Sequence, residues 1–209
     1  MEDRAGHIYR VAAEIMWRRG YTATSMNEIA DAVGLTKAGL YHYIRGKEDL
    51  LFKIMSFAMD MVDEDVMGPA RKVADPEQRL RVMLERHVKR ILEVGGAVTI
   101  LLDEMPALSP AHQRIIRSRK RAYFDLVRST LQQLSSQGKL RAVEPTVATF
   151  GLFGMILWTS RWYRRDGKLK QEDVVKDFLE IALNSVLRKT TAAALAGRTT
   201  LNRKAARTR

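Results

Sequence analysis

The strongest constraint on the fold is the spacing of the apolar residues, which recur at helical intervals along nearly all of the 209 residues. No segment shows the sustained alternation of apolar and polar residues that is typical of a half-buried strand. Proline and glycine interrupt the helical pattern at intervals that suit ordinary helix lengths. The sequence therefore predicts an all-α protein of about nine helices with no sheet.

Capping residues place the ends of these helices. Ser25 and Glu28 match a capping box, in which hydroxyl and carboxylate satisfy each other's backbone donors. Gly20 and Gly34 fit the left-handed position that follows a helix. Pro76 suits a first helical position, where no backbone N–H is needed. The predicted helices cover approximately residues 3–19, 26–33, 37–43, 47 onward, 76–94, 97–103, 110–138, 145–165 and 171–188.

The helices group into a head and a body. We expect a head at residues 2–62, with a helix-turn-helix at about 25–44, and a larger helical body at 63–189. Residues 190–209 carry five basic side chains, no acidic one and few apolar anchors, so we expect a disordered basic tail there.

Composition narrows the classes of function. A formal charge of +12 suggests an acidic partner such as nucleic acid, yet residues 1–50 carry seven basic and seven acidic side chains. Net charge therefore does not indicate DNA binding by this segment, and the positions of individual side chains must be considered instead. The absence of cysteine excludes disulfides and thiolate metal sites. With no apolar run long enough for a signal peptide or a membrane span, we expect a soluble, cytoplasmic protein.

The residues that usually carry catalysis form no recognisable pattern. His7, His42, His87 and His112 lack the spacing of metal ligands, and no nucleophile elbow, P-loop or dinucleotide-binding glycine pattern is present. Asp103 and Glu104 are adjacent, so they do not share one face of a helix. We therefore expect a protein that is not an enzyme and that holds no metal or cofactor.

The segment around residues 25–44 has the pattern of a helix-turn-helix, whose second helix can enter the major groove of DNA. Lys37, Ala38, Tyr41 and His42 would lie on the outer face of that second helix, and Lys47 would open the next helix. Their side chains can donate to bases or phosphates, and the small side chains allow a close approach. Taken singly, each of these residues is an ordinary surface residue, and the interpretation rests on the whole arrangement.

The run IYRVAAEIMWRRGYTATSMNEIADAVGLTKAGLYHYIRGKEDLL, residues 8–51, resembles the DNA-binding head of the TetR family of one-component transcriptional regulators. The matching positions are Ile8, Ala12, Ala13, Gly20, Tyr21, Thr24, Ile29, Ala30, Gly34, Leu40, Tyr41, Lys47, Glu48 and Leu50. Gly39 departs from the family, which commonly has Thr or Ser there to contact the DNA backbone. Met16 and Ile44 replace the usual aromatic residues.

The resemblance implies an all-helical homodimer whose two heads read a palindromic operator in double-stranded DNA. It further implies a repressor that a small effector, bound in the body, releases from the DNA. The residues that would contact DNA are Ser25, Met26, Thr36, Lys37, Ala38, Gly39, Tyr41, His42 and Lys47. Alternatives are a constitutive DNA-binding protein without an effector, a transcriptional activator, and a helical scaffold that resembles the head alone.

The last two predicted helices are candidates for a dimer interface. Residues 147–158 are apolar nearly all round, which predicts a helix buried on more than one side. Packing two such helices from each subunit would give a two-fold, four-helix interface, the arrangement that TetR dimers usually have. The expected interface residues are Phe150, Gly151, Gly154, Phe178, Ile181, Ala182 and Ser185.

Aromatic and basic residues of the body suggest an effector site. The candidates are Leu101, Met105, Leu108, Arg121, Phe124, Phe153, Trp158, Trp162 and Tyr163. The aromatic cluster at 158–163 could equally pack at the core edge. The basic run at 114–121 has the pattern of a solvated outer face, and binding of effector phosphates or a carboxylate is its alternative role. The segments LSPAHQRIIRSRKRAYFDLVRSTL and WTSRWYRRDGKL are similar to TetR regulators of fatty-acid, steroid or aromatic catabolism, several of which respond to acyl-CoA thioesters.

Overall fold

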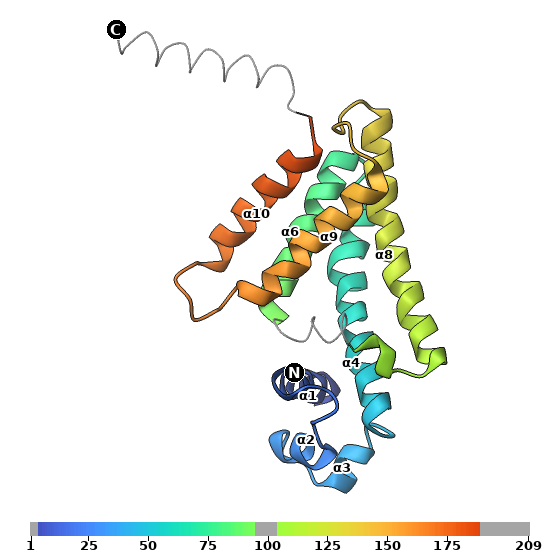
Figure 1. Ribbon diagram of the computed structural model, residues 1–209, viewed down its shortest axis with the longest axis vertical. Helices are drawn as coiled ribbons and strands as arrows, with labels where there is room; N and C mark the ends of the chain where they lie inside the picture. The colour runs from blue at the N-terminus through green and yellow to red at the C-terminus, as the bar shows by residue number, and fades with distance from the viewer. Residues whose placement is uncertain (1–3, 95–103, 189–209) are drawn as a thin grey trace.

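The computed structural model describes residues 4–94 and 104–188, and its helices confirm the all-α prediction (Figure 1). The head holds α1 (Arg4–Arg19), α2 (Met26–Ala32) and α3 (Lys37–Tyr41). A connecting rod follows, made of α4 (Lys47–Val62), the π-helical turn η1 (Asp63–Met67) and α5 (Gly68–Arg71). The body holds α6 (Pro76–Val94), the 3₁₀ turn η2 (Met105–Ala107), α8 (Pro110–Ser136), α9 (Pro145–Trp162) and α10 (Gln171–Val186). The predicted helix at 97–103 and the predicted tail at 190–209 lie outside the described residues.

The three predicted helices of the head form because its caps and its core agree, although α3 ends at Tyr41 instead of near residue 43. Ser25 Oγ accepts the Glu28 N–H over 3.1 Å and opens α2. Thr36 Oγ1 accepts the Gly39 N–H over 3.0 Å and opens α3. Gly34, in the turn between them, has a φ of 65°, which a glycine adopts without strain. The buried apolar residues of the head are Ile8, Ala12, Ala13, Met16, Ile29, Ala30, Val33, Leu40 and Ile44.

The second half of the predicted capping box is replaced by an ion pair. The Glu28 carboxylate lies 2.6 Å from Arg19 Nη1 instead of turning back to the Ser25 N–H. At this place the carboxylate is attracted by the guanidinium and by the N-terminal end of α2 together. The contact joins the last turn of α1 to the first turn of α2.

The connecting rod contains a feature that the sequence did not predict. Between α4 and α5 the chain forms one π-helical turn, at residues 63–67. A Cβ built on Gly68 would lie 3.2 Å from Asp63 O, so a glycine relieves crowding at this turn. The boundary that we place at 62/63 between head and body falls at the start of the turn, inside a continuous helical rod.

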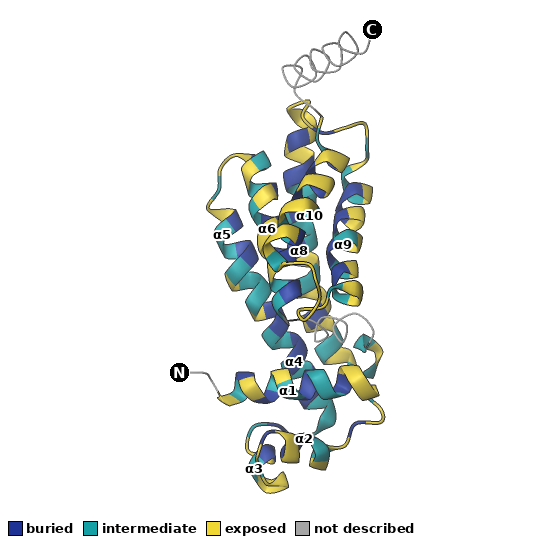
Figure 2. Cartoon of the chain, turned by 90° about the vertical axis from the view of Figure 1, so that its left-hand side faces the viewer, coloured by how far each residue is buried: buried dark blue, intermediate teal, exposed yellow. Residues whose placement is uncertain are grey.

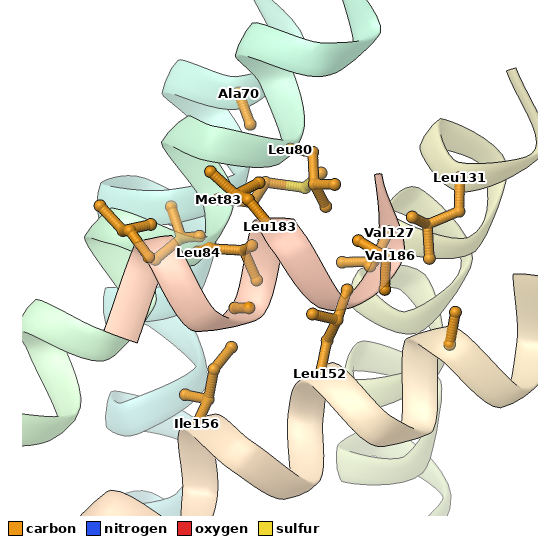
Figure 3. Close-up of a cluster of buried hydrophobic side chains, with 14 of the residues drawn as sticks. Ala70, Leu80, Met83, Leu84, Val127, Leu131, Leu152, Ile156, Leu183 and Val186 are labelled. Carbon is orange, nitrogen blue, oxygen red and sulfur yellow. The ribbon is translucent and has the colours of Figure 1, made fainter. Parts of the chain in front are cut away.

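Four long helices build the body around one apolar core. The helices α6, α8 and α9 pack against one another, and α10 packs mainly on α6. Figure 3 shows side chains from all four helices meeting in this core. They include Leu80, Met83, Leu84, Val127, Leu131, Leu152, Ile156, Leu183 and Val186. No helix in the described ranges is both long and apolar enough to cross a membrane.

The last helix ends earlier than the sequence predicts. Beyond α10 the chain turns to pair with the loop between α8 and α9, where Leu187 forms an isolated antiparallel bridge with Leu140. The Arg188 N–H donates to Lys139 O over 2.8 Å in the same contact. These backbone bonds replace the helical ones that a longer α10 would have made.

Head and body share one packed boundary. Leu108 and Ile116, from the body, are buried in the same apolar cluster as the head residues and the first half of α4. The head is therefore held directly against η2 and the start of α8, as well as through the rod.

We expect Leu131→Ala to lower the free energy of unfolding by about 2–5 kcal/mol, because Leu131 is fully buried and its loss leaves a cavity. The matched control, Leu169→Ala, removes an exposed leucine and should change this free energy by less than about 0.5 kcal/mol. Urea unfolding at one fixed protein concentration measures both. Equal losses in the two variants would contradict the core in Figure 3.

Candidate DNA-binding surface and body cavity

The outer face of α3 presents a compact group of exposed polar side chains. Leu40 is fully buried and fixes the rotation of this short helix. Because of that rotation, Lys37, Tyr41 and His42 face solvent, with Ala38 between them. Among the other residues that the sequence proposes for DNA, Ser25 and Thr36 are exposed, whereas Met26, Gly39 and Lys47 are half-buried.

Gly39 has a local role in this face. Its N–H completes the cap on Thr36, and a Cβ built on it would lie 3.2 Å from Thr36 Oγ1. A larger residue would therefore crowd the capping hydroxyl. Thr36 Oγ1 accepts the bond of the cap, so its own hydrogen remains available to an outside acceptor such as a phosphate.

Lys47 is engaged within the head. Its Nζ donates to Thr22 O over 2.9 Å and lies 4.7 Å from the centre of the Tyr21 ring. The side chain thus holds the start of α4 against the turn between α1 and α2, a role that the sequence did not indicate. A phosphate at this place would share the ammonium with these two partners.

Ion pairing explains how a neutral segment can carry a cationic face. Glu14 pairs with Arg18 at 2.7 Å within α1, and Asp49 pairs with Lys53 at 3.4 Å within α4. Lys37 has no ion-pair partner among the described residues. These two acidic side chains therefore neutralise other bases, and neither is an ion-pair partner of the lysine at the start of α3.

A cavity of about 440 Å³ lies in the body between α4, α6, α8 and α9. Its volume is within the range of small-molecule sites. Most of the lining is apolar, including Met59, Met61, Phe124, Phe150 and Phe153. Four basic residues also line it, namely Arg90, Arg117, Lys120 and Arg121.

The basic residues of the cavity differ in their surroundings. Burial lowers the pKa of Lys120, which is half-buried. Arg121 is exposed and pairs with Asp125 at 3.0 Å. Arg90 forms ion pairs with Asp65 in η1 and with Glu93. The cavity thus combines apolar walls with several cations, which suits an amphipathic anion.

One buried polar pair stands in the cavity wall. His87, on α6, and Tyr123, on α8, share a hydrogen bond of 3.1 Å between Nδ1 and the hydroxyl. Burial lowers the pKa of His87 to about 4 and raises the pKa of Tyr123. Both side chains are therefore neutral near pH 7.

The residues that the sequence suggests for the effector site lie in several different parts of the structure. Arg121, Phe124 and Phe153 do line the cavity. Met105 and Leu108 pack instead against the head core, because η2 lies at the boundary between head and body. The aromatic residues near the end of α9 lie off the cavity, with Trp158 and Trp162 exposed and Tyr163 packed beside α6 and α10. Leu101 lies outside the described residues.

His87 and Arg90 are cavity residues that sequence reasoning missed. A signal was present, because His87 falls on the apolar face of its helix, three and four residues from Leu84, Met83 and Ile91. A lone polar residue on such a face indicates either a satisfied core group or a site. Only the neighbouring helices decide between the two.

A strip of exposed apolar residues follows the outer side of α9. Val147, Phe150 and Trp158 are each about two-thirds exposed, and Gly151 and Gly154 leave open space between them. On α10, Ile181 and Ser185 are exposed and Phe178 is half-buried. Figure 2, in which α10 faces the viewer, shows exposed residues on this side of the helix. Ala182, by contrast, is fully buried within the subunit, on the face of α10 that also buries Leu179 and Val186.

Two groups of contacts connect α8 to α4. Glu48, next to Lys47, accepts the Ser109 N–H over 2.8 Å and lies 2.8 Å from His112 Nδ1. Partial burial raises the pKa of Glu48, but the hydrogen bonds from Ser109 and His112 outweigh it and bring the pKa below its ordinary value. The His112 ring also stacks on Phe52, with centroids 3.7 Å apart.

Arg119 forms the second group of contacts. It donates to Asp60 over 2.6 Å, to Asp63 over 2.5 Å and to Ser56 O over 3.2 Å. The contact fixes the middle of α8 to the end of α4 and to the π-helical turn. Since α8 also lines the cavity, one helix joins the cavity to both ends of α4.

Known proteins resemble the chain in sequence and in fold. Residues 8–54 match the bacterial regulatory proteins of the tetR family, and residues 73–186 match the tetracyclin repressor-like C-terminal domain. The transcriptional repressor KstR2 of Mycobacterium tuberculosis (strain H37Rv) is 25% identical over 188 residues, which cover 89% of this chain and 94% of KstR2. The transcriptional activator FasR of Mycolicibacterium smegmatis is 24% identical over 182 residues, 87% of this chain and 82% of FasR.

A crystal structure of AibR in complex with isovaleryl coenzyme A and operator DNA has a TM-score of 0.77 and 37% identity to this chain. The match covers 86% of this chain and 97% of AibR. The helix-turn-helix head, the helical body and the two matching domains agree, and the chain belongs to the TetR family of DNA-binding transcriptional regulators.

Proposed function

We propose that the protein is a repressor that binds a palindromic operator and leaves it when an acyl-CoA thioester enters the body cavity. The cavity itself carries the proposal, because its apolar walls suit an acyl chain and its four cations suit the phosphates of CoA. The similarity to AibR, whose structure holds isovaleryl coenzyme A and operator DNA, supports this ligand class.

The exposed face of α3 is the surface that we assign to the operator. Lys37, Tyr41 and His42 present donors outward. The small side chain of Ala38 allows the helix to approach the base edges closely. Ser25, Met26, Thr36, Gly39 and Lys47 stay assigned to the rim of this contact, near phosphates.

A second copy of the chain would cover the exposed strip on α9. Val147, Phe150 and Trp158 form an apolar surface that a monomer would leave in water, and the open space over Gly151 and Gly154 allows a helix to approach closely. With Phe178, Ile181 and Ser185 on α10, the strip completes the four-helix interface that we propose. Two heads related by two-fold symmetry would then read a palindrome.

The contacts of α8 supply a route from ligand to DNA. A ligand that draws Arg117 or Lys120 inward shifts α8, and the Glu48–His112 contact passes that shift to the start of α4, beside the head. The spacing of the two heads would change, and with it the affinity for the operator. This is a coupling between two sites through one packed helix.

Activation is the second candidate function, supported by the similarity to the activator FasR. Ligand-dependent DNA binding is compatible with both repression and activation. Transcription in vitro from a template that carries the operator, with and without the protein, separates them: fewer transcripts mean repression.

We expect Lys37→Ala and Tyr41→Ala each to weaken operator binding about tenfold or more, because each removes a donor from the DNA face. Gel-shift titration at fixed salt, on a duplex selected from a random library by the wild-type protein, measures the affinity. Lys168→Ala is the control, since it removes an exposed lysine from the loop between α9 and α10. Operator affinities equal to that of the wild type in both variants would refute the assignment.

We expect Trp158→Glu and Ile181→Glu to shift the protein from dimer toward monomer, because each buries a carboxylate in the proposed apolar interface. Sedimentation velocity over a range of concentrations reads the change. Leu169→Glu places the same charge on an exposed leucine outside the strip and should leave the dimer intact. A wild-type protein that sediments as a monomer would contradict the proposal at once.

We expect octanoyl-CoA to release the wild-type protein from its operator and Glu48→Gln to reduce that release about tenfold, because the variant weakens the contacts to Ser109 and His112. Octanoyl-CoA should bind the variant with an affinity within about threefold of the wild type, since Glu48 does not line the cavity. Glu85→Gln, an exposed carboxylate on α6, is the control. Full release of the variant would show that the cavity and the head are coupled through other contacts than those of Glu48. No release of the wild type would refute the ligand class.

A further inference from the structure

The His87–Tyr123 pair is the part of the cavity that apolar chains and anionic groups do not explain. The two side chains come from different helices, α6 and α8, and are held in place by Phe153 on α9. The centre of the Phe153 ring lies 5.1 Å from that of Tyr123 and 6.1 Å from that of His87. Three helices therefore fix the pair in the cavity wall.

The pair always keeps one hydrogen-bond donor to spare. A neutral imidazole carries one N–H and one accepting nitrogen, and a phenol carries one O–H. The single bond between them uses one of the two hydrogens, whichever residue donates it. In either tautomer the second hydrogen remains, on His87 Nε2 or on the Tyr123 oxygen. Neither side chain has a further hydrogen-bond partner among the described residues.

An acceptor atom on a bound ligand can pair with the unused hydrogen of His87 or Tyr123. Both side chains line the cavity, so a molecule inside it can reach them. They are the only uncharged hydrogen-bonding side chains among the residues that line it, since the remainder are apolar or cationic. A donor beside an apolar cavity costs free energy when it stays unpaired. An oxygen of the ligand would remove that cost.

We propose that the His87–Tyr123 pair donates a hydrogen bond to the carbonyl oxygen of the acyl group in the ligand. The acyl chain would then lie against the phenylalanine wall, and the charged end of the ligand would lie near Arg90, Arg117, Lys120 and Arg121. The inference rests on the proposed function. It adds that the cavity recognises the carbonyl group of the ligand as well as its acyl chain. A hydrocarbon of the same length would fit and bind less well.

A matched pair of ligands tests the proposal. Octanoyl-CoA and S-octyl-CoA differ in that the second has a methylene where the first has the carbonyl. Isothermal titration calorimetry gives the ratio of their affinities for the wild type and for two variants, His87→Phe and Tyr123→Phe. Tyr123→Phe removes only a hydroxyl, so the test survives if His87→Phe fails to fold. Phe153→Leu is the control, because it changes the wall and keeps the donor.

We expect the wild type to prefer octanoyl-CoA by about tenfold, the value of one hydrogen bond. At least one of the two variants should lose this preference and still bind S-octyl-CoA as the wild type does. Phe153→Leu should weaken both ligands and keep the ratio. Equal affinity of the wild type for the two ligands, or a preference that survives in both variants, would overturn the proposal and leave acyl-CoA as the effector.

A second matched pair, 2-octanone and octane, separates this inference from the proposed function. Ligand-detected NMR measures their binding to the same proteins. If no CoA ligand binds but 2-octanone is preferred in the wild type and not in the variants, the carbonyl contact stands and the acyl-CoA proposal fails. If none of the four ligands binds the wild type, both proposals fail.

Discussion

The structure depends on one continuous helical rod. Leu50, Leu51 and Ile54, near the start of α4, are buried in the head core, whereas Val66 and Met67, just beyond it, are buried in the body core. A helix transmits displacement along its axis with little loss, because every turn is bonded to the next. The head therefore has no separate linker in the described chain, and whatever moves α4 moves the DNA-binding surface.

The contacts to this rod have different strengths along its length. Arg119 reaches two carboxylates and a backbone carbonyl at the end of α4, a network of charged hydrogen bonds that resists separation. Glu48 and His112 meet at its start through one carboxylate oxygen. The π-helical turn lies beside the stronger contact, and such turns often occur where a helix must adjust. The rod is thus held to α8 at both ends, by a charged network near the cavity and by Glu48 with Ser109 and His112 near the head.

The sequence predicts the parts of this arrangement that depend on near neighbours. Ser25, Thr36 and Ser109 cap helices through a residue three positions along, so their roles can be seen in the sequence. The cavity depends on which helices come together, and periodicity does not contain that information. Leu108 has the same apolar character as Phe124, yet one packs on the head and the other lines the cavity. Lys47 shows a further limit, because its partner Thr22 lies in a turn whose backbone direction no pattern specifies.

Charge distribution explains why a head with no net charge can serve a protein that binds DNA. Binding to phosphates depends on the potential at the contact surface, and an ion pair placed elsewhere contributes little to it at ordinary salt. Glu28 is paired with Arg19, and Glu48 is turned toward the body. These two carboxylates are therefore engaged with other residues, and Lys37, the single base of α3, has no ion-pair partner among the described residues. A head that was basic throughout would bind any duplex more strongly, and it would lose part of the advantage of its own operator over other DNA.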